Sequence, residues 1–476
     1  MPNVQKHIHI IGIAGVATSA IAIAFKNVGW KVTGSDKGFF PPVSTELTKH
    51  GVSFYAGWHI EKIGMPDIAV VGTASGSKNP ETAYMKEKNI PIYSFAEAVG
   101  KFFVREKSIV VAGTWGKTSS SALLSFILQK AKLDPSYMFG GISISHDSSA
   151  KLTDSKYSVF EGDEYKSSPT DTTPKFAYYK PTHLLLTAIS WDHADLYPTE
   201  EKYFDTFKNL ISKVDFIVAC KDNAGIKRIV DEKGLVNEEE SVDEKKVIWY
   251  GKNNAKYTYG DIEQSRSGLN FKINGIPIYS PMLGKFQIEN ITGCFALAKE
   301  LGIDEKIIIE AIREFEGLKR RLEKRYSDEI EVFDDIAHSG EKAQNTLSTL
   351  RNIYTKKIIA IFEPNAGGRE RSSIEKYDDA FKNADLVIIP RLTNLKVGDN
   401  EDERPMDGNE LASIISKTHK NTVYIENDTN LIDRLKDEAK AEDIIIFMGS
   451  HGFRGMIEEI INYLPSSTIS VKTSLS

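Results

Sequence analysis

Residues 108–121, SIVVAGTWGKTSSS, carry the strongest structural and chemical signal in the chain. An apolar run ends at Gly113, a second glycine follows at Gly116, and Lys117 and Thr118 precede a new apolar, periodic segment. This order predicts a buried strand, a glycine turn and the start of a helix. Backbone N–H groups and the helix dipole favour an anion at such a helix start. We therefore expect a phosphate-binding turn here.

The turn departs from the complete G-x-x-x-x-G-K-[ST] pattern, because Val111 stands at the position of its first glycine. A chance Gly-Lys-Thr in an ordinary loop is the alternative, but the strand before it and the helix after it favour a phosphate. In this interpretation Lys117 reaches the β- and γ-phosphates of ATP, and the Thr118 hydroxyl ligates Mg²⁺. The predicted nucleotide contacts of the turn are Gly113, Thr114, Gly116, Lys117, Thr118 and Ser119.

Length and composition indicate an ordinary globular protein. A chain of 476 residues is typical of about three domains. The net charge of −6 argues against a nucleic-acid surface, which needs a basic face. The two cysteines, Cys220 and Cys294, form no disulfide framework and are expected to be core thiols in a reducing compartment.

The apolar stretch from Ile8 to Phe25 is compatible with a signal peptide or a membrane anchor. It contains a glycine turn with Gly12 and Gly15, and a short strand ending at Asp36 follows it, so we expect a cytoplasmic strand–turn–helix–strand unit. The turn is similar to a dinucleotide fingerprint but lacks the third glycine. Three interpretations stay open: a nicotinamide site, a turn that only packs, and a site for the diphosphate of a UDP-sugar near Asp36.

Alternating strand and helix patterns predict an α/β protein with parallel sheets and right-handed crossovers. The pattern restarts twice, which places the predicted domains at residues 1–105, 106–317 and 318–476. Between Tyr257 and Pro281 short alternating strands take over, with Asn274-Gly275 as a hairpin signal. Two helices are expected at Phe286–Leu301 and Glu305–Phe315.

Acidic and imidazole side chains follow two strands of the middle domain. EGDE ends one strand at 161–164, and WDHAD at 191–195 follows the next. Ligands of open α/β sheets bind at the carboxyl ends of strands, so we expect a carboxylate and an imidazole from these segments to join the hydroxyl of the phosphate turn around one or two magnesium ions. Helix-capping acids and a structural histidine are the alternatives. In the third domain the basic run Lys319-Arg320-Arg321 suits a phosphate and the strand-end carboxylate of Asp335 suits a ribose, although basic runs are often solvated linkers.

The motifs taken in order resemble the Mur ligase family, the ATP-dependent amide-forming enzymes of peptidoglycan assembly. The matching segments are the N-terminal G-x-x-G, GTWGKTSS, EGDEY, DHADLY, GKFQIEN, KRRLE and DDIAH. This resemblance covers essentially the whole chain. It implies a UDP-sugar domain, a central ATPase domain and a C-terminal Rossmann-like domain that brings the amine.

The resemblance also implies roles for individual residues. The catalytic residues would be Lys117, His193 and Arg321, and the metal ligands Thr118, Glu161 and His193. Asn290 would lie near the adenine, Arg321 would reach phosphate and Asp335 would bind the ribose. The expected substrate-binding residues are Gly12, Gly15, Asp36, His338, Arg369 and Arg371. ATP and Mg²⁺ are the expected cofactors, with no nucleic-acid or membrane partner.

Within the family, GSDKGFFPPVST, EGDEYKSS and DHADLY resemble the branch that joins L-Ala-γ-D-Glu-meso-diaminopimelate to UDP-N-acetylmuramate in cell-wall recycling. The branch that adds L-alanine to the same sugar nucleotide is the alternative. Four sites depart from the family pattern: Trp115, Phe286-Gln287, Ser339-Gly340 and Asn365–Arg371. Two other classes stay open, a catalytically silent UDP-sugar-binding protein and a dinucleotide-dependent oxidoreductase. The second leaves the Gly-Lys-Thr and acidic motifs unexplained.

Overall fold

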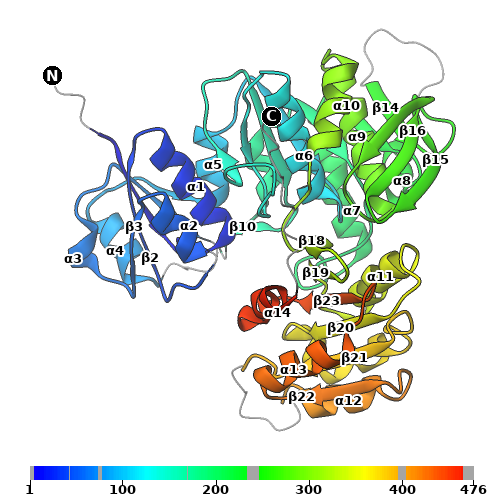
Figure 1. Cartoon of the computed structure of the whole chain (residues 1–476). Helices are drawn as coiled ribbons and strands as arrows, with labels where there is room; N and C mark the ends of the chain where they lie inside the picture. The colour runs from blue at the N-terminus through cyan, green and yellow to red at the C-terminus, as the bar shows by residue number, and fades with distance from the viewer. Residues whose placement is uncertain are drawn as a thin grey trace, which may run out of the picture. The chain divides into compact units, whose positions relative to one another are not determined.

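A computed structural model describes residues 5–41, 43–72, 78–168, 170–232, 246–394 and 404–464 of the chain (Figure 1). It divides into two compact units. The first comprises residues 1–263 and 268–318, and the second comprises 264–267 and 319–476. Among the described residues, the first unit holds a five-stranded, a ten-stranded and a two-stranded sheet, and the second holds a six-stranded sheet.

The N-terminal sheet is parallel, with the strand order β3-β2-β1-β4-β5. Chain order reverses between β1 and β4, which is where ligands bind in open α/β sheets. Its elements in chain order are β1 (His7–Ile11), α1 (Val16–Asn27), β2 (Lys31–Asp36), α2 (Val43–Lys49), β3 (Ser53–Ala56), α3 (Ile60–Ile63), β4 (Ile68–Val71), α4 (Pro80–Glu87), β5 (Ile92–Ser94) and α5 (Phe95–Phe102).

The central sheet has ten strands in the order β17-β16-β15-β14-β13-β12-β6-β9-β7-β8. Strand β6 lies between β12 and β9 and is parallel to both. The strands are β6 (Lys107–Ala112), β7 (Ser136–Met138), β8 (Ala150–Lys151), β9 (Tyr157–Gly162), β12 (His183–Leu186), β13 (Phe216–Cys220), β14 (Lys246–Gly251), β15 (Tyr257–Ser265), β16 (Gly268–Ile273) and β17 (Ile276–Ser280).

Helices cover this central sheet, and α9 and α10 lie against α6 (Figure 1). The helices are α6 (Lys117–Lys130), the 3-10 helix η1 (Lys175–Tyr179), α7 (Glu200–Ile211), α8 (Ala224–Glu232), α9 (Phe286–Glu300) and α10 (Glu305–Glu314). A separate two-stranded ribbon is formed by β10 (Lys166–Ser168) and β11 (Asp171–Pro174).

The second unit contains a six-stranded sheet in the order β18-β19-β23-β20-β21-β22. Its strands are β18 (Glu323–Ser327), β19 (Glu331–Asp335), β20 (Ile358–Glu363), β21 (Leu386–Pro390), β22 (Thr422–Ile425) and β23 (Ile444–Gly449). Its helices are α11 (Gly340–Arg351), η2 (Gly367–Arg369), η3 (Arg371–Tyr377), α12 (Gly408–Ile415), α13 (Asp428–Glu438), η5 (Phe453–Gly455) and α14 (Met456–Tyr463).

The α/β class with parallel sheets is confirmed, as are the predicted local elements around the hairpin. Strands β16 and β17 pair in antiparallel fashion, and Asn274 and Gly275 between them have φ of 50° and 81°. Positive φ at both central residues is the conformation that Asn-Gly turns favour. The short strands β7 and β8 and the ribbon β10–β11 were not predicted, because segments of two to four residues carry too little periodicity.

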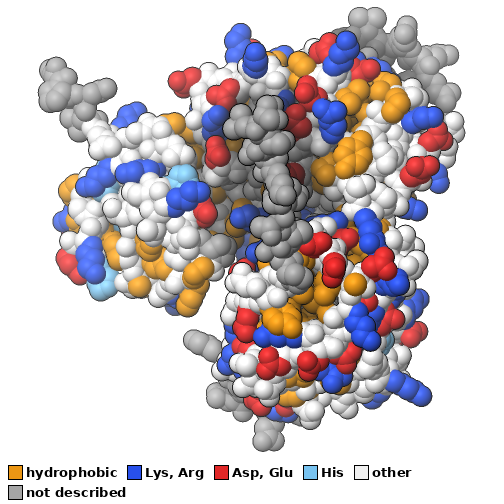
Figure 2. Space-filling view, in the orientation of Figure 1, with side chains coloured by type: hydrophobic (Ala, Val, Ile, Leu, Met, Phe, Trp, Pro, Cys, Tyr) orange, Lys and Arg blue, Asp and Glu red, His pale blue; other side chains and the backbone are white. Residues whose placement is uncertain are grey.

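The surface of the described residues mixes both charge types. On the face in Figure 2, Lys and Arg side chains alternate with Asp and Glu side chains over both units. Among the described residues, no helix combines the length and the apolar character that crossing a membrane requires.

Candidate active site

The turn between β6 and α6 has the backbone of a phosphate cradle. Gly113 and Gly116 have φ of 144° and 82°. A Cβ on Gly113 would lie 2.4 Å from Thr187 Oγ1, and one on Gly116 would lie 2.4 Å from Asn290 Oδ1. Gly113 therefore excludes a side chain, because its Cβ would also lie within 3 Å of the Ala188 backbone, and at Gly116 a side chain would displace the Asn290 amide. No side chain caps the start of α6 at Gly116, so its first amide groups are available to an anion.

Lys117 is held against the turn by a buried carboxylate. Its ammonium lies 2.9 Å from Glu164 Oε2 and 3.2 Å from Oε1, and it also donates to the carbonyls of Gly113 and Thr114. The Glu164 side chain is fully buried, whereas that of Lys117 is 12% exposed. Glu164 is not among the site residues predicted from the sequence. The EGDE motif contains three carboxylates, and only the tertiary packing decides which of them is buried beside the lysine.

Several polar side chains gather around Glu164. The Tyr203 hydroxyl donates to Glu164 Oε1 at 3.1 Å, and the Tyr197 hydroxyl donates to the Glu164 backbone carbonyl at 2.6 Å. His193 Nε2 lies 3.6 Å from Glu164 Oε1. Burial and the Glu164 charge raise the pKa of Tyr203, which keeps this hydroxyl a proton donor. His193 also has a left-handed backbone, with φ of 55°.

Thr118 and Glu161 form the oxygen pair that was predicted for a metal. The Thr118 hydroxyl donates to Glu161 Oε1 at 2.8 Å, and the Gly140 amide donates to Oε2. Hydroxyl and carboxylate oxygens are the hard ligands that Mg²⁺ prefers, so this donor set fits magnesium. His193, the third predicted ligand, contacts Glu164 across the same strand ends.

Asn290, the residue expected near adenine, lies on the first turns of α9 directly beside the phosphate turn. Its Oδ1 approaches Gly116, and its Nδ2 donates to Gln287 Oε1 at 3.0 Å. Both side chains are buried, whereas Phe286 at the start of the helix is 56% exposed. The departure from the family pattern at Phe286-Gln287 therefore leaves Asn290 with an amide partner and places an aromatic ring at the surface.

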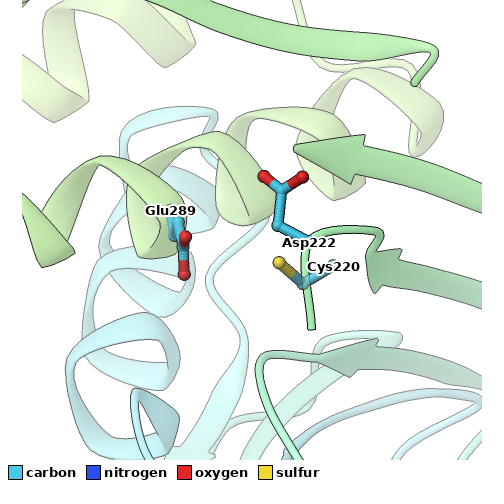
Figure 3. A group of neighbouring side chains, drawn as sticks. All are labelled: Cys220, Asp222 and Glu289. Carbon is cyan, nitrogen blue, oxygen red and sulfur yellow. The ribbon is translucent and has the colours of Figure 1, made fainter. Parts of the chain in front are cut away.

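A cluster absent from the predicted set lies on the neighbouring strand end. Cys220 ends β13, Asp222 follows it, and Glu289 comes from the first turn of α9 (Figure 3). Their ligand atoms all lie within 4.8 Å of one another, and the Tyr259 hydroxyl donates to Glu289 at 3.2 Å. Burial, with the nearby carboxylates, raises the pKa of Cys220 to about 12. Cys220 is therefore a protonated thiol rather than a nucleophile at neutral pH.

The N-terminal glycine turn is built around the predicted residues Gly12, Gly15 and Asp36. Gly12 has φ of 85°, and the Thr18 hydroxyl donates to the carbonyls of Gly12 and Gly15 at 2.7 and 3.0 Å. Asp36 Oδ2 accepts from the Ala14 amide at 2.9 Å, and Oδ1 accepts from Lys37 N. Asp36 thus holds the turn itself. Contact between Asp36 and a nucleoside stays a prediction.

In the second unit, both carboxylate oxygens of Asp335 accept hydrogen bonds from backbone amides. Its Oδ2 accepts from the Leu322 amide at 2.7 Å, and its Oδ1 accepts from the Ala337 amide at 2.8 Å. Burial raises the pKa of Asp335, although these bonds oppose the shift. Arg321, on the adjoining segment, is exposed. The carboxylate fixes the 320–322 segment to the end of β19, and its proposed ribose contact stays a prediction.

Arg369 uses part of its guanidinium group to hold neighbouring loops. Its Nε donates to the Met406 carbonyl at 2.8 Å and its Nη1 to the Thr393 carbonyl at 2.6 Å, and the side chain is buried. Arg371 pairs with Glu410 at 3.0 Å. Two of the Arg369 donors thus join two loop segments, and a contact of Arg369 or Arg371 with a substrate carboxylate stays a prediction.

His338, the third residue expected at the amine site, is partly buried at the end of β19. Its Nδ1 lies 2.6 Å from the Ile336 carbonyl, and its Nε2 lies 3.3 Å from Lys342 Nζ. Burial, followed by the charge of Lys342, lowers the pKa of His338. The imidazole is therefore neutral at physiological pH, with Nδ1 protonated toward the carbonyl.

Three family models match the chain in succession. Residues 7–107 match the Mur ligase family catalytic domain, residues 111–298 the Mur ligase middle domain, and residues 320–451 the Mur ligase glutamate ligase domain. Among curated relatives, UDP-N-acetylmuramate–L-alanine ligase of Dictyoglomus turgidum is 29% identical over 463 residues, which cover 94% of each chain. The enzyme of the same name from Persephonella marina is 29% identical and covers 96% of this chain and 97% of its own.

Solved structures show the same fold. The UDP-N-acetylmuramate–alanine ligase of Thermotoga maritima aligns with a TM-score of 0.77 at 22% identity, covering 96% of this chain and 99% of its own. A murein peptide ligase of Psychrobacter arcticus aligns with a TM-score of 0.66 at 23% identity, covering 96% and 98%. These likenesses confirm the three-domain architecture expected from the motifs.

Proposed function

The chain belongs to the Mur ligase family of ATP-dependent, amide-bond-forming ligases, and we propose that it joins the lactyl carboxylate of UDP-N-acetylmuramate to L-alanine. The observation that carries the ligase chemistry is the arrangement at the end of β6. There Lys117 and the Thr118–Glu161 pair adjoin a glycine turn whose helix amides are uncapped. A lysine, a hydroxyl and a carboxylate around such a turn suit a nucleotide triphosphate with its metal.

The proposed reaction has two steps. The sugar carboxylate attacks the γ-phosphorus of ATP, which gives an acyl phosphate and ADP. The amine then attacks the acyl carbon, the tetrahedral intermediate collapses to the amide, and inorganic phosphate leaves with the proton lost from the amine. The protein acts mainly by positioning its substrates and by offsetting the repulsion between two anions. Lys117 supplies positive charge at the phosphates.

Thr118 and Glu161 are the residues that would hold Mg²⁺, with His193 as the further candidate at the neighbouring strand end. The bound ion would neutralise phosphate charge. Glu164 keeps the Lys117 ammonium oriented toward the turn, and the Tyr203 hydroxyl satisfies the second oxygen of that carboxylate. These contacts pre-organise the donors before the nucleotide arrives, which lowers the cost of orienting them in the transition state.

Two observations favour L-alanine over the tripeptide that the sequence motifs favoured. The relatives that match along nearly their whole length are named as L-alanine ligases. In addition, two N–H groups of Arg369, which with Arg371 is one of the two arginines that could clamp the side-chain carboxylates of a larger acceptor, are bound to backbone carbonyls. L-Alanine has no side-chain carboxylate and needs no such clamp.

Phosphate release with UDP-N-acetylmuramate and ATP tests the proposal. The amine is either L-alanine or L-Ala-γ-D-Glu-meso-diaminopimelate at equal concentration, and each sugar nucleotide product is identified by mass. We expect a higher kcat/KM with L-alanine. A higher value with the tripeptide would assign the chain to the murein peptide ligase branch. If neither amine supports phosphate release although the protein binds the sugar nucleotide, the chain is a catalytically silent binding protein.

A further inference from the structure

One buried carboxylate in the N-terminal sheet joins four segments of the chain. Glu81 lies in the first turn of α4, and its side chain is fully buried. Its Oε1 accepts from the Tyr55 hydroxyl and from the His59 amide, each at 2.8 Å. Its Oε2 accepts the Ser35 hydroxyl and lies 3.5 Å from His9 Nε2. Strands β1, β2 and β3 and the loop before α3 therefore meet at this side chain.

Glu81 is ionised in spite of its burial. Burial raises its pKa, but the adjacent His9 imidazole and the hydrogen bonds from Ser35, the His59 backbone and Tyr55 outweigh that effect, so the pKa lies below its ordinary value. A buried charge is costly unless it is paired and hydrogen-bonded, and here every donor comes from a different segment. The start of α4 fixes the position of Glu81, because the Asn79 side chain accepts from the Glu81 amide at 2.9 Å.

Ser35 connects this carboxylate to the glycine turn. While its hydroxyl donates to Glu81, its backbone carbonyl accepts from the amides of Gly12 and Ile13 at 2.8 and 3.1 Å. The turn leads into α1, whose start at Gly15 has no side-chain cap. The amides of the turn are therefore held by β2, through the Ser35 carbonyl and the Asp36 carboxylate, and Glu81 holds the Ser35 side chain in addition to the ladders that pair β2 with β1 and β3.

We propose that Glu81 is a positioning residue for the anion site at the start of α1, acting through Ser35 on the turn. It governs affinity for a nucleoside-diphosphate sugar without taking part in the phosphoryl or acyl transfer. This inference rests on the proposed function, which places UDP-N-acetylmuramate on the N-terminal sheet. If the carboxylate were merely structural, its substitution would lower the stability of the protein and would not change the affinity for the sugar nucleotide more than the affinity for ATP.

Two variants interrupt the connection at different points. Ser35→Ala deletes only the hydroxyl between Glu81 and the turn, and Glu81→Gln removes the charge at nearly constant volume. Asp67→Asn is the matched control, because Asp67 accepts from the His7 amide at 2.7 Å at the opposite end of β1. Dissociation constants for UDP-N-acetylmuramate are measured by calorimetry, with steady-state constants and thermal unfolding on the same samples.

We expect Ser35→Ala and Glu81→Gln to raise the Kd for UDP-N-acetylmuramate about tenfold, which corresponds to one hydrogen bond to a charged group. The KM for ATP and kcat at saturating sugar nucleotide should stay within about twofold of wild type, and Asp67→Asn should leave the Kd unchanged. Should Glu81→Gln not fold, Ser35→Ala alone decides the question.

An unchanged Kd in Ser35→Ala, or an equal loss of affinity for ATP and for the sugar nucleotide, would overturn the positioning role. A wild-type protein that does not bind UDP-N-acetylmuramate would overturn the proposed function and this inference together. Wild-type binding with unchanged variants would overturn this inference alone.

Discussion

The ammonium group of Lys117 lies 2.9 Å from the carboxylate of Glu164, a side chain that is fully buried beneath the phosphate turn. The lysine of the Gly-Lys-Thr motif therefore has two roles: it faces the turn where phosphate is expected, and it neutralises a charge in the interior. Removing either partner alone leaves the other without its counterion, and breaking a buried pair in this way is strongly destabilising.

Lys117→Ala should therefore lose both activity and stability. Loss of a charge partner for phosphate typically costs about 3–4 kcal/mol of transition-state stabilisation, and the unpaired Glu164 costs about 3–5 kcal/mol of unfolding free energy. The double variant Lys117→Met, Glu164→Gln should regain most of the stability and none of the activity. Urea unfolding and phosphate release measure the two effects. A Lys117→Ala enzyme with more than a tenth of wild-type turnover would contradict the assignment of the phosphate turn.

Glu161→Gln should raise the Mg²⁺ concentration needed for half-maximal rate, because it removes a full negative charge from the Thr118–Glu161 oxygen pair. His193→Ala should cause a smaller increase, since it removes a neutral ligand. Asp195→Asn is a suitable control. Asp195 lies on the same strand-end segment as His193, but its carboxylate accepts a hydrogen bond from the Tyr165 hydroxyl. If the magnesium titrations of Glu161→Gln and wild type superimpose, Glu161 is not a magnesium ligand and its role is structural.

Gly116→Ala should weaken ATP binding, whereas Gly302→Ala should leave it unchanged. The two glycines have nearly equal φ, 82° and 83°, so an alanine is strained by about 1 kcal/mol at either position. Only at Gly116 does the added Cβ meet another group, Asn290 Oδ1 at 2.4 Å, while Gly302 has open space around it. Equilibrium dialysis with ATP separates the variants. Equal ATP affinity in both would show that the close approach of the turn to α9 is dispensable.

The stability of the first unit should fall as the pH drops from about 6.5 to 4, because of His146. Burial lowers the pKa of His146 to about 4, and its ring packs against Phe126, Tyr137 and Phe139. Between these pH values His146 binds a proton in the unfolded chain but not in the folded chain. Up to about 3 kcal/mol of the free energy of unfolding, which is fully present above pH 6.5, is therefore lost as the pH falls. Urea midpoints measured at pH 7.5 and 4.5 should differ less in His146→Gln. The exposed His451→Gln should keep the wild-type difference.

Much of the site could be predicted from the sequence because local order already encodes it. An apolar run, two glycines and Lys117-Thr118 require a strand, a turn and a helix start, and Asn274-Gly275 requires a hairpin. The spacing of the strands after the phosphate turn placed the EGDE and WDHAD segments at the ends of parallel strands, and the family resemblance singled out Glu161 and His193 within them. These inferences depend on chain-local geometry and on the rule that parallel strands deliver their carboxyl ends to one edge.

Only the tertiary structure selected among chemically equivalent groups. Three carboxylates stand in EGDE, and packing alone buries Glu164 against Lys117 while Glu161 meets Thr118. An arginine that the sequence offers to a substrate, Arg369, is bound by backbone carbonyls from loops far along the chain. Sequence determines which groups exist and on which kind of element. Burial and the distances between segments decide which charges are neutralised within the protein and which remain for a ligand.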